Sequence, residues 1–489
     1  MGQDVQRDHF EHRDFERFGR RLRDETAALH ALHEAAALSA HAPVIGLELE
    51  AWLIDADGRP ASRNEEFLAA LDSPDVVTEL GRFNFELNVP PQPAAGEGLA
   101  RLAAALESLW DRCRQSAADL GLQPLMVGIL PSLRDADLSL DNLSARARYR
   151  ALNEQVQRQR HGRPLRLDLD GPHGEHVHST HRDVMLEAAA TSFQVHLQLP
   201  ADRMVRAYNA ALIASAPLVA ACANSPLLFG RRLWAETRIP LFEQALGLGA
   251  REDGRGEALA RVGFGSGYAG YSLVEPFREN LDRFEPLLPV LLDEPADRLA
   301  HLRLHNGTIW RWNRPLVGFD PDGQVHLRIE HRPLSAAPSL ADAIANLAFA
   351  AGLIAALATQ SEPPEQQLPF ERARDNFYRA ARDGLAAHIA WPRRDGETTA
   401  GALALALLPT AADGLSWLGV PGAEAGRWLD IVEARVAGGR TGAAWQLEAL
   451  DAAAGDAMRM TRAYARQQAT GEPVHRWPQP SRLGAGRVA

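Results

Sequence analysis

Two glutamates stand two residues apart in the most strand-like segment of the chain, "IGLELEAWLI" at residues 45–54. Alternate side chains of a strand share a face, so Glu48 and Glu50 lie together with Gly46 and Trp52, while the opposite face is apolar. Neighbouring carboxylates repel each other unless water or a cation separates them. The segment therefore predicts a strand with one buried face and one face whose paired charges need water or a cation.

Three further segments repeat this pattern: "RFNFELNV" at 82–89, "SFQVHLQL" at 192–199 and "VHLRIEHR" at 325–332. Their polar faces carry Glu86, Gln194, His196, Glu330 and Arg332. A half-solvated antiparallel sheet would explain any one of these strands. The whole set, however, offers four carboxylates and an imidazole, which suit Mg²⁺ or Mn²⁺, with arginines beside them that suit phosphate.

The composition limits the classes of partner. The chain has 489 residues, 46% of them hydrophobic, which is enough for a large core in one large domain or two smaller ones. Its 63 acidic residues against 52 basic ones give a net charge of −11, which argues against a nucleic-acid or anionic-membrane binder. A small-molecule partner is favoured.

Cysteine use and the apolar stretches indicate a cytoplasmic protein. Only Cys113 and Cys222 occur, so neither a disulfide framework nor a cysteine zinc site is expected. The N-terminal residues are polar and lack the apolar core of a signal peptide. The longest apolar stretch, from Ala210, is interrupted by Pro217, and we interpret it as a buried helix rather than a membrane span.

The sequence contains no lysine, so all 52 basic residues are arginines. A Walker P-loop, a protein kinase site and Schiff-base chemistry each need a lysine and are excluded. Any phosphate must be bound by arginine, metal or backbone. Arginine suits this task because its planar fork can pair with two phosphate oxygens at once.

Helices and strands are mixed along the chain, which predicts an α+β architecture with a sheet packed on helices. Helices are expected over residues 8–40, 98–120 and 201–222 and from 340 onward. Further strands are expected at "LMVGIL" (125–130) and "GTIWRWN" (307–313), whereas residues 132–182 look polar and irregular.

Five motifs together resemble the glutamate-cysteine ligase family, in its bacterial carboxylate-amine ligase branch, which shares the glutamine synthetase fold. They are "GLELE" (46–50), "FNFELN" (83–88), "SFQVH" (192–196), "NGTIWRWNRP" (306–315) and "RIEHRPLSAAPS" (328–339), in the order of the family. The resemblance implies a curved antiparallel sheet forming one side of an active-site funnel. Together with the sequence pattern, it predicts four parts: an N-terminal helical segment 1–40, a catalytic domain 41–350, a helical C-terminal layer 351–470 and a loose tail 471–489.

The resemblance also assigns roles to residues. Glu50 and Glu86 would bind one Mg²⁺, and Glu48 and Glu330 another, with Gln194 or His196 beside it. Arg332 would neutralise the transferred phosphate, while Arg311 and Arg314 would hold phosphate or a substrate carboxylate. Related ligases often carry histidine where this chain has Gln194, which leaves the occupant of that coordination position open.

The implied reaction is an ATP-dependent ligation. ATP phosphorylates a carboxylate, and an amine then displaces phosphate from the acyl phosphate, with metals and arginines offsetting the repulsion between anions. Glutamate and cysteine are the default substrates by resemblance. A non-catalytic nucleotide or amino-acid sensor and a metal-dependent hydrolase remain as alternatives, and the sequence leaves open whether the chain forms a homo-oligomer.

Two other motifs could suggest different chemistry. "GSGYAG" (265–270) matches a dinucleotide-binding pattern, but it lacks a clear strand before it and a phosphate-binding helix after it, so we reject that interpretation. "HGEHVHSTHRD" holds His173, His176, His178 and His181 and could bind zinc. Without cysteines or helical spacing, a solvated loop is the favoured interpretation.

Overall fold

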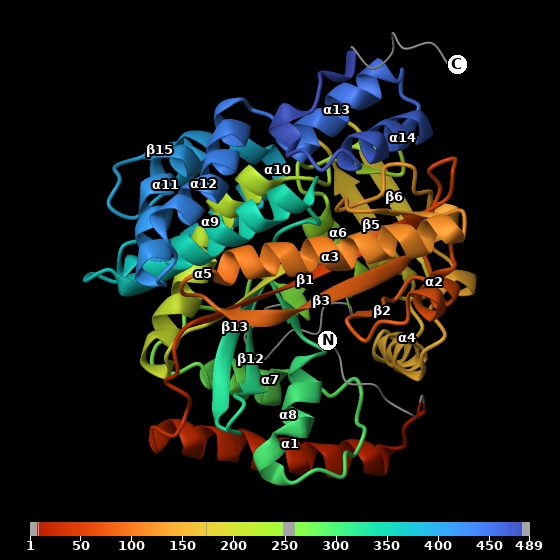
Figure 1. Cartoon of the computed structure of the whole chain (residues 1–489). Coiled ribbons are helices and arrows are strands. Elements are labelled where there is room, and N and C mark those ends of the chain that lie inside the picture. The colour runs from red at the N-terminus through yellow and green to blue at the C-terminus, as the bar shows by residue number, and fades with distance from the viewer. Residues whose placement is uncertain (1–6, 8, 173, 248–259, 482–489) are drawn as a thin grey trace.

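The computed structural model describes residues 7, 9–172, 174–247 and 260–481. A curved, antiparallel sheet crosses its centre (Figure 1). In spatial order its strands are β12 (Asn313–Phe319), β13 (Val325–His331), β7 (Phe193–Gln198), β1 (Val44–Ile54), β3 (Asn84–Pro93) and β2 (Val76–Thr78), and β4 (Gln123–Leu125) also pairs with β1. The predicted α+β class, with a curved antiparallel sheet packed on helices, is confirmed.

Strand β1 has the two faces that its sequence predicts. Leu47 and Leu49 are buried, whereas Glu48 and Glu50, which alternate with them, keep part of their surface accessible. The strand is central because it pairs with β3 on one side and with β7 on the other. Its polar side chains are thereby brought next to those of both neighbours.

Helices cover the apolar face of the sheet. Helix α3 (Gly98–Asp119) lies across β1 and β3 (Figure 1), and α9 (Leu340–Thr359) packs on β7. Helix α5 (Met204–Cys222) packs against β12 and β13 and also against α9. This packing removes the apolar face from water and leaves the glutamate-bearing face for the site.

A helical layer follows α9, as expected. Its helices are α10 (Phe370–Asp383), α11 (Ala400–Trp417), α12 (Gly422–Ala437), α13 (Gly442–Ala452) and α14 (Ala457–Gln468). Helix α9 crosses residue 350, the boundary expected between catalytic domain and helical layer. A loose tail was expected from residue 471, but Trp477 is buried, and its ring centroid lies 5.1 Å from that of Trp445. Residues 482–489 lie outside the described residues.

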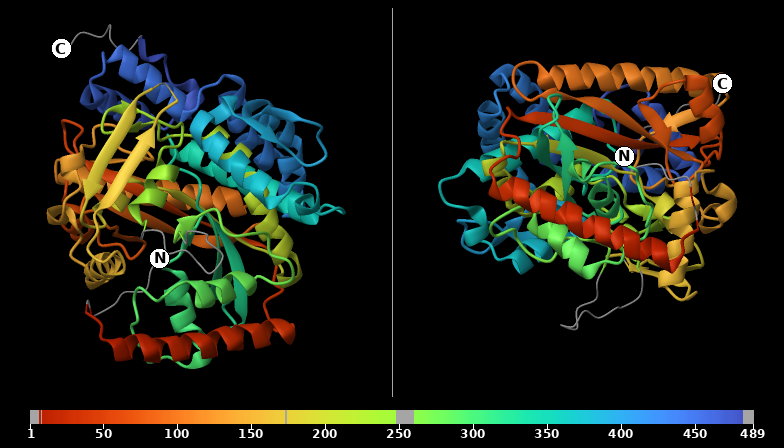
Figure 2. Two further views of the ribbon diagram at one scale, coloured as in Figure 1. Left: turned by 180° about the vertical axis from the view of Figure 1, so that it is seen from behind. Right: turned by 90° about the horizontal axis from the view of Figure 1, so that it is seen from below.

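The N-terminal helix α1 (His12–Glu34) runs along the bottom of the molecule in Figure 1 and in the left view of Figure 2. It packs against α7 (Glu275–Arg283) and α8 (Ala300–Asn306). The fully buried carboxylate of Glu25 accepts from His301 Nδ1 at 2.6 Å and from the backbone N–H of Leu302 at 2.8 Å. This buried pair fixes α1 to α8.

Three expectations about local structure were wrong. Residues 132–182, expected to be irregular, contain α4 (Ala147–Gln159) and an antiparallel hairpin of β5 (Leu165–Asp170) and β6 (His176–His181). The hairpin alternates buried and exposed residues, but its exposed positions are charged, which hid the strand pattern in the sequence. Of "LMVGIL", only the first residue belongs to a strand. Within "GTIWRWN", β11 is only Trp310–Arg311, which pairs with β10 (Val262–Gly263) rather than the central sheet.

The remaining elements are short. They are α2 (Asn64–Leu71), α6 (Arg238–Ala245), the pair β8 (Leu227–Leu228) and β9 (Arg231–Arg232), and the pair β14 (His388–Ala390) and β15 (Glu397–Thr399).

Two helices are long and apolar enough to cross a membrane by length and composition alone, at Ala201–Cys222 and Leu340–Thr359. In the most apolar 18-residue window of each helix, 89% and 83% respectively is buried inside the protein. Core helices of soluble proteins are buried in the same way.

Replacing Glu25 with alanine should destabilise the protein by about 3 kcal/mol or more, because two buried donors lose their acceptor. Urea denaturation of the purified protein measures this change. Glu16→Ala, an exposed position on the same helix, is the control and should change stability by less than about 1 kcal/mol. Equal stability of the two variants would contradict the anchoring role of the Glu25–His301 pair.

Candidate active site

Polar side chains from β1, β3, β7 and β12 meet at one cavity of about 510 Å³ on the open face of the sheet. Of the residues predicted for the site, those that line it are Glu48, Glu50, Glu86, Gln194, Arg314 and Arg332. The pairing of the strands explains why these side chains meet. Glu50 on β1 stands opposite Glu86 on β3, and Glu48 on β1 stands opposite Gln194 on β7.

Glu50 and Glu86 form a first carboxylate cluster together with Glu79, which follows β2. One oxygen from each lies within 4.8 Å of the others. Glu50 is held in place by Ser192, whose N–H and hydroxyl donate at 2.7 and 2.8 Å, and by Gln194 Nε2 at 3.0 Å. Its position is therefore fixed before any ligand binds.

This first cluster is electrostatically strained. Burial, reinforced by the charge of Glu48, raises the pKa of Glu86 to about 7, and burial also raises the pKa of Glu50. The pKa of Glu79 is well above its usual range, because of burial and then the charges of Glu86 and Glu50. Three carboxylates so placed are stable as anions only beside a cation.

A second cluster joins Glu48, His196 and Glu330, which come from β1, β7 and β13. His196 Nε2 lies 3.4 Å from Glu48 Oε1 and 4.0 Å from Glu330 Oε1. Burial lowers the pKa of His196 to about 4. Its Nε2 atom is buried without a hydrogen-bond partner among the described residues, while Nδ1 accepts from Arg328 Nε at 3.1 Å.

Arginines neutralise the second cluster. Arg314 donates to both oxygens of Glu330 at 2.8 and 3.0 Å, and Arg332 donates to Glu330 at 3.0 Å and also to Gln194. Burial alone would raise the pKa of Glu330, but Arg314 and Arg332 hold it well below its usual range. The Nε atom of Arg332 is buried with no partner in the described part of the chain, so it can still donate to a bound anion.

Arg311 does not join this group. Its guanidinium donates to Glu279 at 2.7 Å and to Asn280, both on α7, and it is not among the residues described as lining the cavity. The sequence could not separate Arg311 from Arg314, because a break between β11 and β12 sends the two side chains into different surroundings.

Several cavity residues were missed from the sequence. They are Glu79, Arg148, Tyr149, Glu187 and Arg238. Burial, followed by the charge of Glu50, raises the pKa of Glu187 to about 8. Arg238 donates to the backbone carbonyl of Arg332 at 2.8 Å. All five lie outside the strands whose alternation identified the others, so no periodic signal marks them.

The "GSGYAG" segment does not form a phosphate-binding turn. The backbone N–H groups of Gly270, Tyr271 and Ser272 donate to the carboxylate of Glu275, at the start of α7. These are the donors that a phosphate would need at a helix N-terminus. An internal carboxylate already occupies them, in agreement with the rejection of the motif.

The geometry supports a site for two divalent cations and an anionic ligand. Carboxylate oxygens and one imidazole are ligands that Mg²⁺ or Mn²⁺ accepts, and the strain of the first cluster fits a bound cation. Arg314, Arg332 and Arg238 place positive charge beside the clusters. Such a constellation can bring a polyphosphate next to another anion.

The chain resembles known proteins over most of its length. The family model described as glutamate-cysteine ligase family 2 (GCS2) matches residues 44–472. A search of curated proteins found no match. Among solved structures, a bifunctional glutathione synthetase from Pasteurella multocida aligns over 92% of this chain and 55% of its own, with 12% identity and a TM-score of 0.53. A glutamate-cysteine ligase from Francisella tularensis, in complex with AMP, aligns over 92% of both chains, with 11% identity and a TM-score of 0.53.

These structures share the fold of this chain. The chain spans only 55% of the length of the bifunctional enzyme.

The contribution of Glu86 to the stability of the metal-free protein should fall as the pH rises from about 5 to about 7. Glu86 has a pKa of about 7 in the folded state against an ordinary value of 4.5, so the unfolded chain releases this proton first. The stabilising contribution is therefore complete below the unfolded pKa and is lost as the pH rises toward the folded one.

In chelator, the melting temperature of the wild type minus that of Glu86→Gln should therefore fall by about 2 °C or more between pH 5 and pH 7. Glu107→Gln, at an exposed position on α3, is the control and should behave like the wild type. A parallel pH dependence in Glu86→Gln would show that this carboxyl group is not strained.

Proposed function

Because the chain belongs to the glutamate-cysteine ligase family and is a ligase of that type, we propose that it joins a carboxylate to an amine with ATP and Mg²⁺ or Mn²⁺. The carboxylate is first phosphorylated and the amine then displaces phosphate. The observation that carries this proposal is the pair of acidic clusters on one sheet face, of which Glu48, Glu50, Glu79 and Glu86 line the same cavity as Arg238, Arg314 and Arg332. The proposed substrates are the γ-carboxylate of glutamate and the amine of cysteine or of another small molecule.

Two sets of residues would hold the cations. Glu50, Glu79 and Glu86 would bind one, and Glu48, His196 and Glu330 the other. Gln194 would act as a positioning residue, because it donates to Glu50 and accepts from Arg332. Bound divalent cations would neutralise phosphate charge and polarise the phosphoryl oxygens.

Arg332 and Arg314 would hold the anionic groups together. Substrate carboxylate oxygen forms a bond to the γ-phosphorus while the bond from that phosphorus to the ADP oxygen breaks. The amine nitrogen then bonds to the acyl carbon as the carbon–oxygen bond to phosphate breaks. Both steps concentrate negative charge where Arg332 lies, and a guanidinium stabilises it without needing to lose a proton. Arg311 keeps its predicted role only if the substrate reaches beyond the cavity described above.

Apolar residues complete the wall of the cavity. Leu152, Phe242 and Trp310 line it together with the charged groups. Excluding water protects an acyl phosphate from hydrolysis and strengthens each charge interaction. This feature favours a ligase over a hydrolase, which must admit water to the reacting atom.

Small-molecule substrates and ATP fit an acidic protein in the cytoplasm, with neither nucleic acid nor a membrane as its partner. We also propose that the chain divides into an N-terminal segment 1–40, a catalytic domain 41–350, a helical layer 351–470 and a tail 471–489.

ADP release should require both a carboxylate and Mg²⁺ or Mn²⁺, and should rise when a suitable amine is added. The assay couples ADP formation to a screen of amino acids and amines in pairs, starting with glutamate and cysteine. ADP release that ignores every amine would favour the sensor or a simple ATPase. Hydrolysis of amides or phosphoesters without nucleotide would favour the hydrolase instead.

Glu50→Gln should lower ligase activity by about 100-fold or more, because it keeps the shape of the side chain but weakens a metal ligand. Without metal its melting temperature should equal or exceed that of the wild type, since one repelling charge is removed. Mg²⁺ with a non-hydrolysable ATP analogue should raise the melting temperature of the wild type more than that of the variant.

Glu107→Gln again serves as the control, because its carboxylate is exposed on α3 far from the cavity lining. If Glu50→Gln keeps both full activity and the full nucleotide-dependent shift, the carboxylates are only a polar sheet face.

A further inference from the structure

The hairpin of β5 and β6 carries a second group of ligand-type side chains outside the active-site cavity. Its alternation buries Leu167, Leu169 and Val177 and exposes the residues between them. Across the hairpin Asp168 stands opposite His178, and Asp170 stands opposite His176. Regular strand pairing therefore places two imidazoles and two carboxylates on one accessible face.

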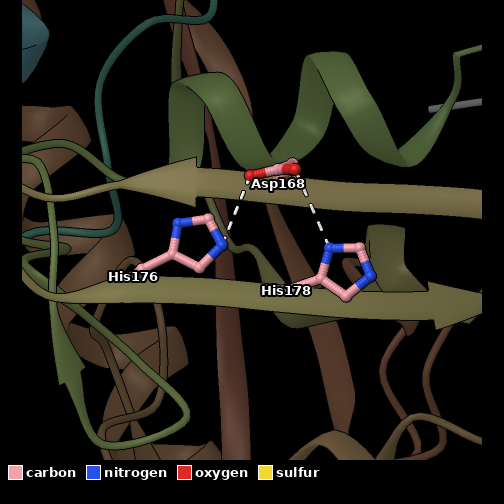
Figure 3. Close-up of side chains that lie close together, drawn as sticks. All are labelled: Asp168, His176 and His178. Atoms are coloured by element: carbon pink, nitrogen blue, oxygen red, sulfur yellow. Dashed lines mark ion pairs between the residues drawn. The ribbon is translucent and has the colours of Figure 1, made fainter.

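Three of these side chains converge, as Figure 3 shows. His176 Nε2 lies 3.4 Å from one oxygen of Asp168, and His178 Nδ1 lies 3.8 Å from the other. One ligand atom from each residue lies within 4.8 Å of the others. Ligands of a tetrahedral zinc ion are separated by about 3.4 Å, so small side-chain rotations would bring all three into coordination distance.

The orientation of His176 gives an independent argument. Its Nδ1 lies 2.8 Å from Asp170 Oδ1, and because a carboxylate only accepts, Nδ1 must carry a proton. In the neutral ring Nε2 is then a bare lone pair, and it faces an oxygen of Asp168 at 3.4 Å. Two acceptors face each other, which a cation between them would relieve.

The same contact resembles the outer shell of a metal site. Histidines that bind metals commonly donate their other ring nitrogen to a carboxylate, which fixes the tautomer and aims the lone pair at the ion. Asp170 stands in that position relative to His176.

We propose that Asp168, His176 and His178 form a zinc-class metal site on the β5–β6 hairpin, separate from the active-site clusters. Two imidazoles and one carboxylate favour Zn²⁺ over Mg²⁺, and the exposure of all three leaves further coordination positions to water. The site would be structural. Gln244 on α6 already pairs with the backbone of Asp168 through two hydrogen bonds, and an ion would fix β6 to β5 in the same region.

The test is a zinc titration of the full chain by calorimetry in excess Mg²⁺, which keeps the carboxylate clusters of the active site occupied. The double variant His176→Ala/His178→Ala should lose one zinc equivalent per chain relative to the wild type. Asp168→Asn, which keeps the volume of the side chain, should weaken that equivalent at least tenfold. His12→Ala is the matched control, because His12 is exposed and pairs with a single carboxylate, Glu16, at 3.4 Å.

Co²⁺ provides a spectroscopic readout, since bound Co²⁺ should give visible absorption that the double variant lacks. Equal zinc stoichiometry and affinity in the wild type, the double variant and Asp168→Asn would overturn the proposal. The outcome is independent of the ligase function, because ADP formation with Mg²⁺ should be unchanged in both hairpin variants.

Discussion

The repulsion between carboxylates held side by side on β1, β3 and the end of β2 is the constraint on which the site depends. Burial raises the pKa values of Glu50, Glu79 and Glu86, so the folded protein holds groups that resist ionisation. The sheet can hold these carboxylates together, at a cost in folding free energy, because its opposite, apolar face is packed on α3, α5 and α9. A large apolar core thus stabilises a polar face that would be unfavourable alone.

The sequence predicted most of this face because a strand has a period of two. Once Glu48 and Glu50 are assigned to one side of β1, the same rule selects Glu86, Gln194, His196 and Glu330 on its neighbours. Antiparallel pairing then brings them together, although helices separate these strands along the chain. Register could not be predicted, yet a shift by two residues would still have kept all of them on one face.

What could not be predicted lies where periodicity ends. Glu79 follows a strand of only three residues, and Arg148 and Glu187 come from a helix and a 3₁₀ turn within or beside the segment taken as irregular. The β5–β6 hairpin was overlooked for a related reason: its outward positions carry Asp and His, which strands seldom favour. Arg311, in contrast, was predicted for the site but lies outside the cavity lining. It is only three residues from Arg314, yet it belongs to β11 and Arg314 to β12.

The two acidic clusters differ in a way that bears on mechanism. Glu330 already has two arginine partners, which keep its pKa low, so the second cluster is neutralised by the protein itself. The first cluster has hydrogen-bond donors in Ser192 and Gln194 but few positive charges, and its pKa values are raised. A cation therefore relieves more strain at Glu50, Glu79 and Glu86 than at Glu48 and Glu330.

The cation site of the first cluster should fill without nucleotide. A cation at the second cluster must compete with Arg314 and Arg332, and it depends on phosphate oxygens to supply the missing negative charge. Unequal neutralisation of this kind would couple occupation of the second position to the arrival of the nucleotide. A bound phosphate would compete with Glu330 for Arg314 and Arg332, and it would offer further oxygen ligands to the ion.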